Sequence, residues 1–286
     1  MKAIIPAAGM GTRFLPLTKS QPKEMLPVVD KPVIQYVVEE AVGAGVSEIL
    51  IVTGRGKRAL EDHFDRSVEL EQLLAETGKV EALATVLAIA DLAEVFYVRQ
   101  KQPHGLGHAV LCGAPFTDDE AFYVMLGDVL VPDCGILPRL REVHERTGAS
   151  VIAVMPVPDE QVSLYGVIAG EADADGVWRV SGLVEKPCRE DAPSNLAIFG
   201  RYLLTPRVMQ LLGDTPPGKG GEIQLTDALV ALLEHEEIYA VVIEPDEGFD
   251  TGNVLSWLEA NIELTLRRKD YGAQLRASMA RMLERD

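Results

Sequence analysis

The sequence predicts an α/β protein in which a mixed, mainly parallel sheet is flanked by helices and followed by a helical C-terminal extension. Up to Gln100, short runs rich in β-branched residues alternate with longer helical patterns, which is the order expected of a parallel sheet. Near Tyr165 this alternation gives way to strands joined by Gly- and Asp-rich turns. From Asn253 onward the chain is nearly all helical, with its apolar residues on one stripe.

The N-terminal elements follow one another in regular order. "KAIIPAA" predicts a strand, "VIQYVVEEAVGAG" a helix, and "EILIVTG" and "VFYVRQ" two further strands. Strand, helix, strand is the pattern of a right-handed βαβ unit. Between the last two strands, the tract from Arg58 to Glu94 has apolar residues at three- and four-residue spacing and is interrupted at "ETGK", which predicts two helices.

The central part of the chain predicts a mixed sheet. "AFYVMLGDVLV" and "GASVIAVMPV" predict buried strands, and "YGVIAGEADADGVWRVSGLVEKP" predicts a hairpin that turns at "DADG". No internal repeat and no Pro/Ser-rich linker interrupts the chain. We therefore expect one domain over residues 1–252 and a helical extension over residues 253–286, which is a candidate contact within a homodimer or homotetramer.

Composition limits the classes of ligand. The chain has 286 residues, of which 47% are hydrophobic, enough for a large core. Acidic residues outnumber Lys and Arg by 44 to 27, and the net charge of −17 repels the phosphates of nucleic acids and anionic lipids. We expect neither as a partner. A small anionic ligand requires a few cations and a metal ion that make one cleft locally positive.

Cysteine usage and the N-terminus indicate the compartment. The three cysteines, Cys112, Cys134 and Cys188, lie far apart and form no CxxC pair, so neither a disulfide framework nor a zinc site is indicated. The N-terminal apolar run is too short for a signal peptide, and no apolar run reaches membrane-spanning length. We expect a cytoplasmic protein.

The loop "AAGMGTR" directly follows the first predicted strand. It lacks both the Gly-Lys-Ser/Thr of a Walker motif and the third glycine of the dinucleotide fingerprint. Gly9 and Gly11 let the backbone approach an anion closely, and Arg13 adds a permanent charge. Lys23 follows in "QPKEMLP", where flanking prolines predict a rigid, non-helical segment. A plain Gly-rich turn is the alternative.

Two aspartates follow predicted strands. Asp128 in "VMLGDVLV" is costly at a central strand end unless it binds a cation, although a turn or helix N-cap is a common alternative for a Gly-Asp pair. Asp250 lies on a similar Gly-flanked turn in "GFDTG". Asp133 is expected to be a surface turn residue. No histidine or cysteine cluster accompanies these carboxylates, which favours Mg²⁺ over Zn²⁺.

Further polar candidates occupy the later motifs. Gln100 ends a predicted strand and offers an amide that can both donate to and accept from a base edge. His108 in "GLGHA" has no carboxylate or nucleophile spaced to partner it, so we expect a structural role. Glu185 and Lys186 in "GLVEKP" would point to opposite faces of a strand. Asp227 is as consistent with capping the helix "DALVALLEHE" as with a site.

Several motifs together resemble one known family. "PAAGMGTRFLPLTKSQPKEMLPVVDKPVIQYVVEEA" resembles the N-terminal signature of bacterial UTP–glucose-1-phosphate uridylyltransferases, which are sugar-nucleotide pyrophosphorylases. The resemblance continues through "VRQKQPHGLGHAVLCG", "GDVLV", "YGVI", "GLVEKP", "GKGGEIQLTDAL" and "FDTGN", up to about Gly252. It implies a Rossmann-like (GT-A-like) nucleotidyltransferase fold and the reaction UTP + α-D-glucose 1-phosphate ⇌ UDP-glucose + diphosphate, with Mg²⁺ as cofactor.

The resemblance also implies roles for individual residues. The catalytic group it implies is Arg13, Lys23, Asp128 and Lys186. The nucleotide-binding group it implies, in which Gln100 contacts the uracil, is Ala7, Ala8, Gly9, Gly11, Thr12, Arg13, Glu24, Gln100 and Gly105. The sugar-phosphate group it implies is Gly166, Glu185, Lys186 and Glu222. The metal ligands it implies are Asp128 and Asp250.

Three alternatives remain at this point. A glucose-1-phosphate thymidylyltransferase more often reads "LAGGSGTR" where this chain has "PAAGMGTR". A non-catalytic paralogue that binds a nucleotide sugar and regulates a partner enzyme could have lost the cations and Asp128, all of which are retained here. A glycosyltransferase is disfavoured because no DxD metal motif ends a suitable strand.

Overall fold

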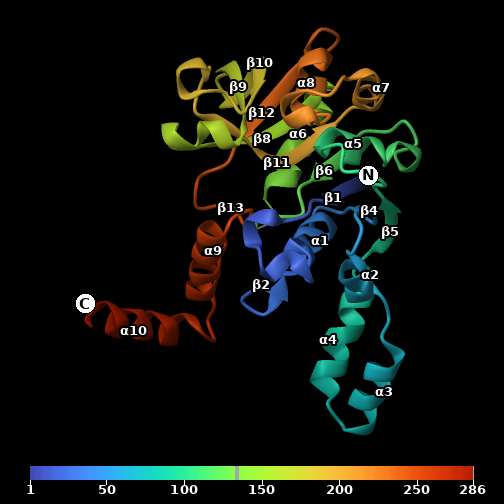
Figure 1. Ribbon diagram of the computed structural model, residues 1–286, viewed down its shortest axis with the longest axis vertical. Helices are drawn as coiled ribbons and strands as arrows, with labels where there is room; N and C mark the ends of the chain where they lie inside the picture. Colours follow the sequence, from blue (N-terminus) through green and yellow to red (C-terminus); the bar gives the residue numbers. More distant parts are fainter. Residues whose placement is uncertain (133–134, 286) are drawn as a thin grey trace.

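The computed structural model describes residues 1–132 and 135–285 and contains one nine-stranded sheet at its centre (Figure 1). The strands lie in the order β5-β4-β1-β6-β11-β8-β12-β10-β9. Their bounds are β1 Lys2–Ala7, β4 Glu48–Thr53, β5 Glu94–Arg99, β6 Phe122–Met125, β8 Ser150–Pro156, β9 Gly166–Ala172, β10 Val177–Glu185, β11 Leu196–Leu204 and β12 Ile238–Val242. Two short pairs lie outside this sheet: β2 Pro27–Val28 with β3 Lys31–Pro32, and β7 Val129–Leu130 with β13 Phe249–Asp250.

The strand directions confirm a mixed, mainly parallel sheet. The neighbours β5, β4, β1 and β6 pair in parallel, as do β8 and β12. The pairings of β10 and β11 with their neighbours are antiparallel. Every strand of the sheet except these two therefore runs in one direction. β9 and β10 form the hairpin predicted around "DADG".

Helices cover both faces of the sheet (Figure 1). The α-helices are α1 Val33–Gly43, α2 Arg58–Phe64, α3 Val68–Glu76, α4 Val80–Ala90, α5 Leu106–Leu111, α6 Ile136–Thr147, α7 Arg207–Asp214, α8 Leu225–Leu233, α9 Val254–Arg267 and α10 Gly272–Leu283. Short 3₁₀ turns are η1 Thr12–Phe14, η2 Leu17–Lys19, η3 Lys23–Met25, η4 Ala114–Phe116, η5 Asp159–Leu164, η6 Arg189–Asp191 and η7 Lys219–Gly221. The core has one layer on each side of the sheet, since alternate side chains of a strand face opposite ways. Thus Ala3 and Ile5 pack with α1 and α6, while Ile4 packs with α5 and α8.

The tract from Arg58 to Glu94 contains three helices, so the prediction of two was wrong. The predicted interruption at "ETGK" separates α3 from α4, but a second one at residues 65–67 separates α2 from α3. α3 and α4 form a hairpin that projects from the body (Figure 1). No residue of α4 is buried, although its sequence, "VEALATVLAIA", is almost entirely apolar.

The C-terminal helices form a second projection. Asn253 caps α9, its side chain accepting a hydrogen bond from the backbone N–H of Ser256. Trp257 anchors α9 to the body because its indole donates to the Pro27 carbonyl at 3.0 Å and its ring lies edge-on to Phe14. α10 extends away to the C-terminal end of the chain (Figure 1).

Some expectations from the sequence concern residues 133–134, which lie outside the described part of the chain. These are the surface turn at Asp133 and the thiol of Cys134. The other two cysteines, Cys112 and Cys188, are free. Over the described residues, we find no helix with the length and apolar character needed to cross a bilayer.

Candidate active site

The loop after β1 folds over the segment that carries Lys23. Gly11 has a left-handed backbone with φ of +64°, and a Cβ there would lie 3.1 Å from the Thr18 methyl and 3.2 Å from Lys23 Cβ. Thr18 also donates to the Gly11 carbonyl at 2.7 Å. The glycine is therefore required by both the turn and the close packing. Lys23 itself begins η3, so the segment expected to be non-helical contains one three-residue 3₁₀ turn but no α-helix.

A cleft of about 470 Å³ opens at the carboxyl ends of β1, β5 and β6. This is where open α/β sheets bind ligands. The loop after β1, the end of β5 and the turn into α5 line it. Its lining includes the sequence-predicted residues Ala8, Gly9, Gly11, Thr12, Arg13, Lys23, Glu24, Gln100, Gly105, Asp128 and Glu222. Ala7 does not line it, because this strand residue is buried in the core.

Lys23 and Asp128 form an ion pair in the cleft, each with about a fifth of its side chain exposed. Burial disfavours the charged lysine, but Asp128 and Glu24 outweigh that effect and raise the pKa of Lys23. Burial likewise opposes ionisation of Asp128, but the charge of Lys23 holds the pKa of this carboxyl below its ordinary value. Both groups are therefore charged at neutral pH. The sequence-based expectation that Asp128 needs a cation is met here by Lys23.

Asp250 lies beside Asp128 although 122 residues separate them in the chain. A Cβ at Gly252 would lie 2.8 Å from Asp250 Oδ1 and 3.4 Å from Asp128 Oδ2, so the two carboxylates flank this glycine. The antiparallel pair β7–β13 and the bond from the Thr251 N–H to the Asp128 carbonyl at 2.9 Å hold them together. Burial, and then repulsion by Asp128, raises the pKa of Asp250. Arg13 faces the same point, with Nη1 3.6 Å from that Cβ position.

Glu24 lines the cleft from a buried position. Its side chain is 1% exposed, and Oε2 pairs with Lys57 Nζ at 2.6 Å. Burial raises the pKa of Glu24 despite the charges of Lys57 and Lys23. Its second oxygen, Oε1, has no hydrogen-bond partner among the described residues. This oxygen is itself buried, so in this structure Glu24 presents no free acceptor to the cleft.

The predicted sugar-phosphate residues gather beside the cleft. Glu185, at the end of β10, accepts a hydrogen bond from Thr226 at 2.6 Å. A Cβ at Gly166 would lie 2.9 Å from the Thr226 hydroxyl and 3.2 Å from Glu185 Oε2, so only glycine leaves this space open. Glu222 belongs to the main cleft, where a Cβ at Gly105 would lie 2.6 Å from Glu222 Cβ. Glu222 in the main cleft and the group of Gly166 and Glu185 beside it therefore form adjacent subsites rather than one pocket.

Lys186 does not point away from Glu185, so that prediction was wrong. Its ammonium lies 3.0 Å from Glu185 Oε1. Strand alternation does not apply because β10 ends at Glu185 and Lys186 has a positive φ of 47°. The carbonyl of Lys186 accepts from Lys219 at 2.5 Å, and its N–H donates to the Tyr165 carbonyl at 2.9 Å.

Several neighbours of the candidates were missed by the sequence reading. Tyr165 donates to Asp250 at 2.9 Å and thereby links the metal candidates to the sugar-phosphate group. Lys57 donates a hydrogen bond to Glu24, and Thr226 donates one to Glu185. The tyrosine of the motif "YGVI" was a usable signal for Tyr165, whereas nothing in the sequence distinguishes Lys57 from a surface lysine.

The sequence suggests structural roles for two residues, His108 and Asp227. His108 contacts Gln100 and Cys112 and no carboxylate among the described residues, as expected of a residue without an acid–base partner. Asp227 lies in the first turn of α8, but the cap residue is Gln224 and its side chain makes no capping bond. The suggestion that Asp227 caps this helix was therefore wrong.

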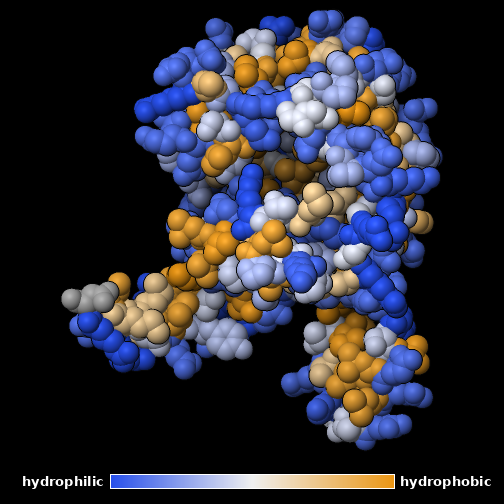
Figure 2. Space-filling model, viewed as in Figure 1, coloured by the Kyte–Doolittle hydropathy of each residue, from blue (hydrophilic) through white to orange (hydrophobic). Residues whose placement is uncertain are grey.

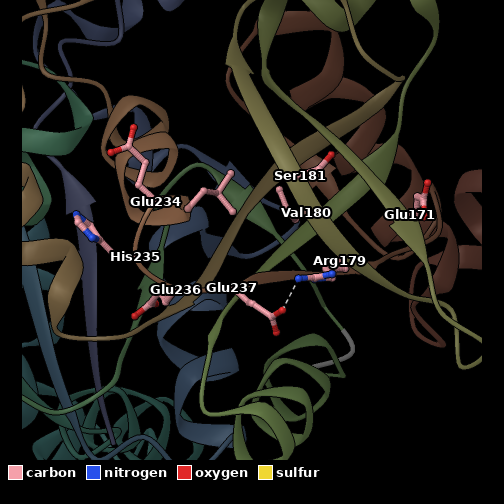
Figure 3. A pocket seen from close by; sticks show the side chains of 9 residues that line it. Glu171, Arg179, Val180, Ser181, Glu234, His235, Glu236 and Glu237 are labelled. Atoms are coloured by element: carbon pink, nitrogen blue, oxygen red, sulfur yellow. Dashed lines mark ion pairs between the residues drawn. The ribbon is translucent and has the colours of Figure 1, made fainter.

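A larger hollow of about 580 Å³ lies elsewhere, between β10 and the C-terminal end of α8 (Figure 3). It contains an ion pair between Arg179 and Glu237 at 2.6 Å and several further acidic side chains. None of the sequence-predicted site residues lines it. Its volume alone therefore does not make it the active site.

Known proteins are similar to this chain in fold and in sequence. The family model described as Nucleotidyl transferase matches residues 2–267. A UTP–glucose-1-phosphate uridylyltransferase from Bacillus subtilis is 49% identical over 286 residues, which cover 100% of this chain and 96% of the relative. A UTP-bound UGPase from Acinetobacter baumannii is 41% identical, with a TM-score of 0.89 over 98% of both chains. A UDP-glucose pyrophosphorylase complexed with UDP-glucose is 45% identical, with a TM-score of 0.84 over 93% of this chain and 99% of that one. These relatives confirm the resemblance drawn from the motifs, and the chain belongs to the nucleotidyl transferase family, among its UTP–glucose-1-phosphate uridylyltransferases.

Proposed function

We propose that the protein catalyses UTP + α-D-glucose 1-phosphate ⇌ UDP-glucose + diphosphate in the cytoplasm. The observation that carries this proposal is the cleft itself. It brings the glycine loop, the Lys23–Asp128 pair and the amide of Gln100 to the carboxyl edge of one sheet. Residues 1–252 form the catalytic domain and residues 253–286 the helical extension.

The reaction is an in-line substitution at phosphorus. An oxygen of the sugar phosphate forms a bond to the α-phosphorus of UTP. The bond from that phosphorus to the bridging oxygen of the β-phosphate breaks, and its electron pair leaves with diphosphate. Both reactants are anions, so positioning and charge neutralisation are the principal tasks and no protein nucleophile is needed.

The nucleotide side of the site is built around the loop after β1. Its residues Ala8 to Thr12 bind the phosphates through the backbone, with Ala7 at its strand end, while Arg13 and Lys23 neutralise charge on the triphosphate and on departing diphosphate. Gln100 and Gly105 contact the base. Glu24 lines the nucleotide side of the cleft, and its contact with UTP requires the buried Oε1 to become accessible.

The sugar-phosphate side lies next to it. Glu185 accepts hydrogen bonds from glucose hydroxyls, and Lys186 contacts the phosphate that attacks. Gly166 leaves space for the sugar ring, and Glu222 supports the sugar subsite from the adjacent main cleft. The contact between Lys186 and Glu185 keeps the lysine at the sugar side before substrate binds.

The residues present fit a Mg²⁺ ion. Asp128 and Asp250 flank Gly252 and supply hard oxygen ligands, while no group of three or more His, Cys, Asp or Glu gathers among the described residues. Two carboxylates, completed by water and substrate phosphates, suit Mg²⁺. When bound, the ion neutralises and orients the reacting phosphates. Before UTP binds, Lys23 forms an ion pair with Asp128. When UTP binds, the ammonium of Lys23 moves to the triphosphate.

The chain assembles as a homodimer or homotetramer. Both projections carry exposed apolar side chains, which Figure 2 shows as hydrophobic surface on the α3–α4 and α9–α10 arms. Val80 is 73% exposed on the first arm, and Leu255 and Leu283 are 66% and 75% exposed on the second. Apolar surface concentrated in this way favours burial against another copy.

A nucleotide panel tests the reaction. UTP, dTTP, ATP, CTP and GTP are each supplied with glucose 1-phosphate and Mg²⁺, and diphosphate release is followed. We expect UTP to give the highest kcat/KM. A preference for dTTP would make the protein a thymidylyltransferase. Absence of turnover with all five, in folded protein, would favour a regulatory paralogue.

A further inference from the structure

The side-chain amide of Gln100 is held at two points. Gln100 follows the end of β5, is 8% exposed and lines the cleft. Its Nε2 lies 3.0 Å from the Gly105 carbonyl oxygen and 2.9 Å from Nδ1 of His108. Gly105 and His108 belong to the turn into α5 and to α5 itself, so one loop-helix junction determines how this amide is turned.

These contacts determine which end of the amide faces the cleft. A backbone carbonyl can only accept a hydrogen bond, so the nitrogen of Gln100 and not its oxygen must face Gly105. The second hydrogen of that nitrogen then points to His108, whose Nδ1 must be an unprotonated acceptor. The sulfur of Cys112 lies farther away, 3.9 Å from the same Nδ1. His108 is therefore neutral, with its proton on Nε2.

The arrangement leaves Gln100 with one function toward a ligand. Both amide hydrogens are occupied, so the side chain has no donor to offer. Its Oε1 makes no hydrogen bond with any described residue. A base that meets this amide can therefore only donate to it. Where N3 of the base faces this oxygen, uracil and thymine offer an N3–H donor, whereas N3 of cytosine is an acceptor and would face the oxygen with like polarity.

We infer that His108 is a positioning residue for base selection: together with the Gly105 carbonyl, it orients Gln100 so that Oε1 accepts from the N3–H of uracil and rejects cytosine. This inference rests on the proposed function, which puts the base of UTP in this part of the cleft. It also restricts what Gln100 does, since thymine has the same N3–H. Discrimination of UTP from dTTP must arise elsewhere.

Kinetics and binding with UTP and CTP test the inference. His108→Ala removes the acceptor of the second hydrogen, so the amide is held at the Gly105 carbonyl alone and one of its N–H groups becomes available to a base. His108→Asn retains an acceptor oxygen. The matched control is His104→Ala, because His104 packs edge-on against His108 with ring centroids 5.2 Å apart but bonds Gln102 instead of Gln100. Diphosphate release gives kcat and KM for each nucleotide, calorimetry gives Kd without the sugar phosphate, and thermal unfolding checks that each variant is folded.

We expect His108→Ala to lower the UTP-to-CTP ratio of kcat/KM by on the order of 10-fold, the effect of one lost hydrogen bond of about 1.4 kcal/mol. The change should appear in KM for UTP, with kcat and the KM for glucose 1-phosphate nearly unchanged. His108→Asn should lose less, and His104→Ala should keep the wild-type ratio.

The outcomes separate this inference from the proposed function. An unchanged UTP-to-CTP ratio in folded His108→Ala overturns the inference while the reaction stands. Conversely, a wild-type protein that turns over no nucleotide but binds UTP more tightly than CTP, with the difference reduced in His108→Ala, refutes the reaction and supports the role of His108. Equal wild-type affinity for UTP and CTP overturns the inference.

Discussion

Arg201 and Glu40 form an ion pair in the protein interior, with side chains 0% and 1% exposed and Arg201 Nη2 2.6 Å from Glu40 Oε2. Arg201 also donates to the carbonyls of Leu126 at 3.3 Å and Val129 at 2.8 Å. These carbonyls lie on either side of Asp128 in the chain. The buried pair thus connects α1 and β11 to the turn that carries a candidate metal ligand.

Removing one member of this pair should destabilise the fold. Glu40→Gln leaves the guanidinium of Arg201 buried without its counter-charge, which costs about 3–5 kcal/mol. Urea unfolding should show that loss in the free energy of unfolding. The double variant Glu40→Gln/Arg201→Met should lose less than the sum of the two single changes. Strict additivity would mean that the two side chains do not stabilise one another.

Turnover should depend on Mg²⁺ and on the carboxylate of Asp128. Chelation should abolish turnover and Mg²⁺ should restore it. Asp128→Asn should reduce kcat by at least about 100-fold, the scale of one lost transition-state contact, without unfolding the protein. Asp250→Asn should do the same or less. Asp62→Asn, on the surface of α2, is the matched control. Full activity of Asp128→Asn, or tight Mg²⁺ binding without nucleotide, would contradict this assignment.

Variants of Lys23, which lines the cleft, and of Lys186, which lies beside it, should differ in the substrate whose use they weaken. Lys23→Ala should weaken UTP, and Lys186→Ala should weaken glucose 1-phosphate. Each should lose about 10- to 150-fold in kcat/KM, the equivalent of a charged hydrogen bond of roughly 1.5–3 kcal/mol. Lys79→Ala, at the exposed start of α4, serves as control. If Lys186→Ala impairs UTP alone, the two phosphate sites are reversed.

UTP affinity should depend on pH through His108. Burial, and then the charge on His104, lowers the pKa of His108 from its ordinary 6.5. The neutral ring that accepts from Gln100 therefore prevails at pH 7.5. As the pH falls below 6.5 toward the lowered pKa, Nδ1 gains a proton and can no longer accept, so KM for UTP should rise. Besides Gln100, His104 and Cys112 contact the ring.

The comparison that isolates this effect is the ratio of KM for UTP between wild type and His108→Asn from pH 5.5 to 8. Titration of UTP itself affects both proteins and cancels in the ratio. The ratio should rise only on the acid side. A ratio that stays constant over this range would show that protonation of His108 does not affect UTP binding.

Disrupting the apolar arms should change the assembly. The wild-type mass in solution, from light scattering, should be two or four times that of the 31.1 kDa chain. Leu73→Glu on α3 or Leu283→Glu on α10 should reduce it, because each puts a charge on an exposed apolar arm. Val230→Glu, on α8 away from both arms, should not. A wild-type mass of one chain would contradict the proposed oligomer.

Much of the fold could be predicted from the sequence because local patterns are sufficient for it. β1 and β4 are runs of apolar residues buried on both faces, and α1 between them has the helical period, so the parallel unit is visible without any long-range information. The second interruption in the tract before β5 was missed because residues 65–67 contain neither Gly nor Pro. Helix ends of that kind depend on tertiary packing.

The sequence by itself determined the family, the loop after β1 and the types of polar group that the site needs. Only the tertiary structure decided which of them meet. Lys23 reaches Asp128 and Asp250 comes to lie beside it because the sheet and the β7–β13 pair bring distant segments to one edge. The positive φ of Lys186 overrides strand alternation and turns it toward Glu185. From the sequence alone, the Gln100 amide could either donate to a ligand or accept from it. In the fold, the Gly105 carbonyl, which can only accept, lies against its nitrogen. The direction of a hydrogen bond thus depends on neighbours in space and not on neighbours in sequence.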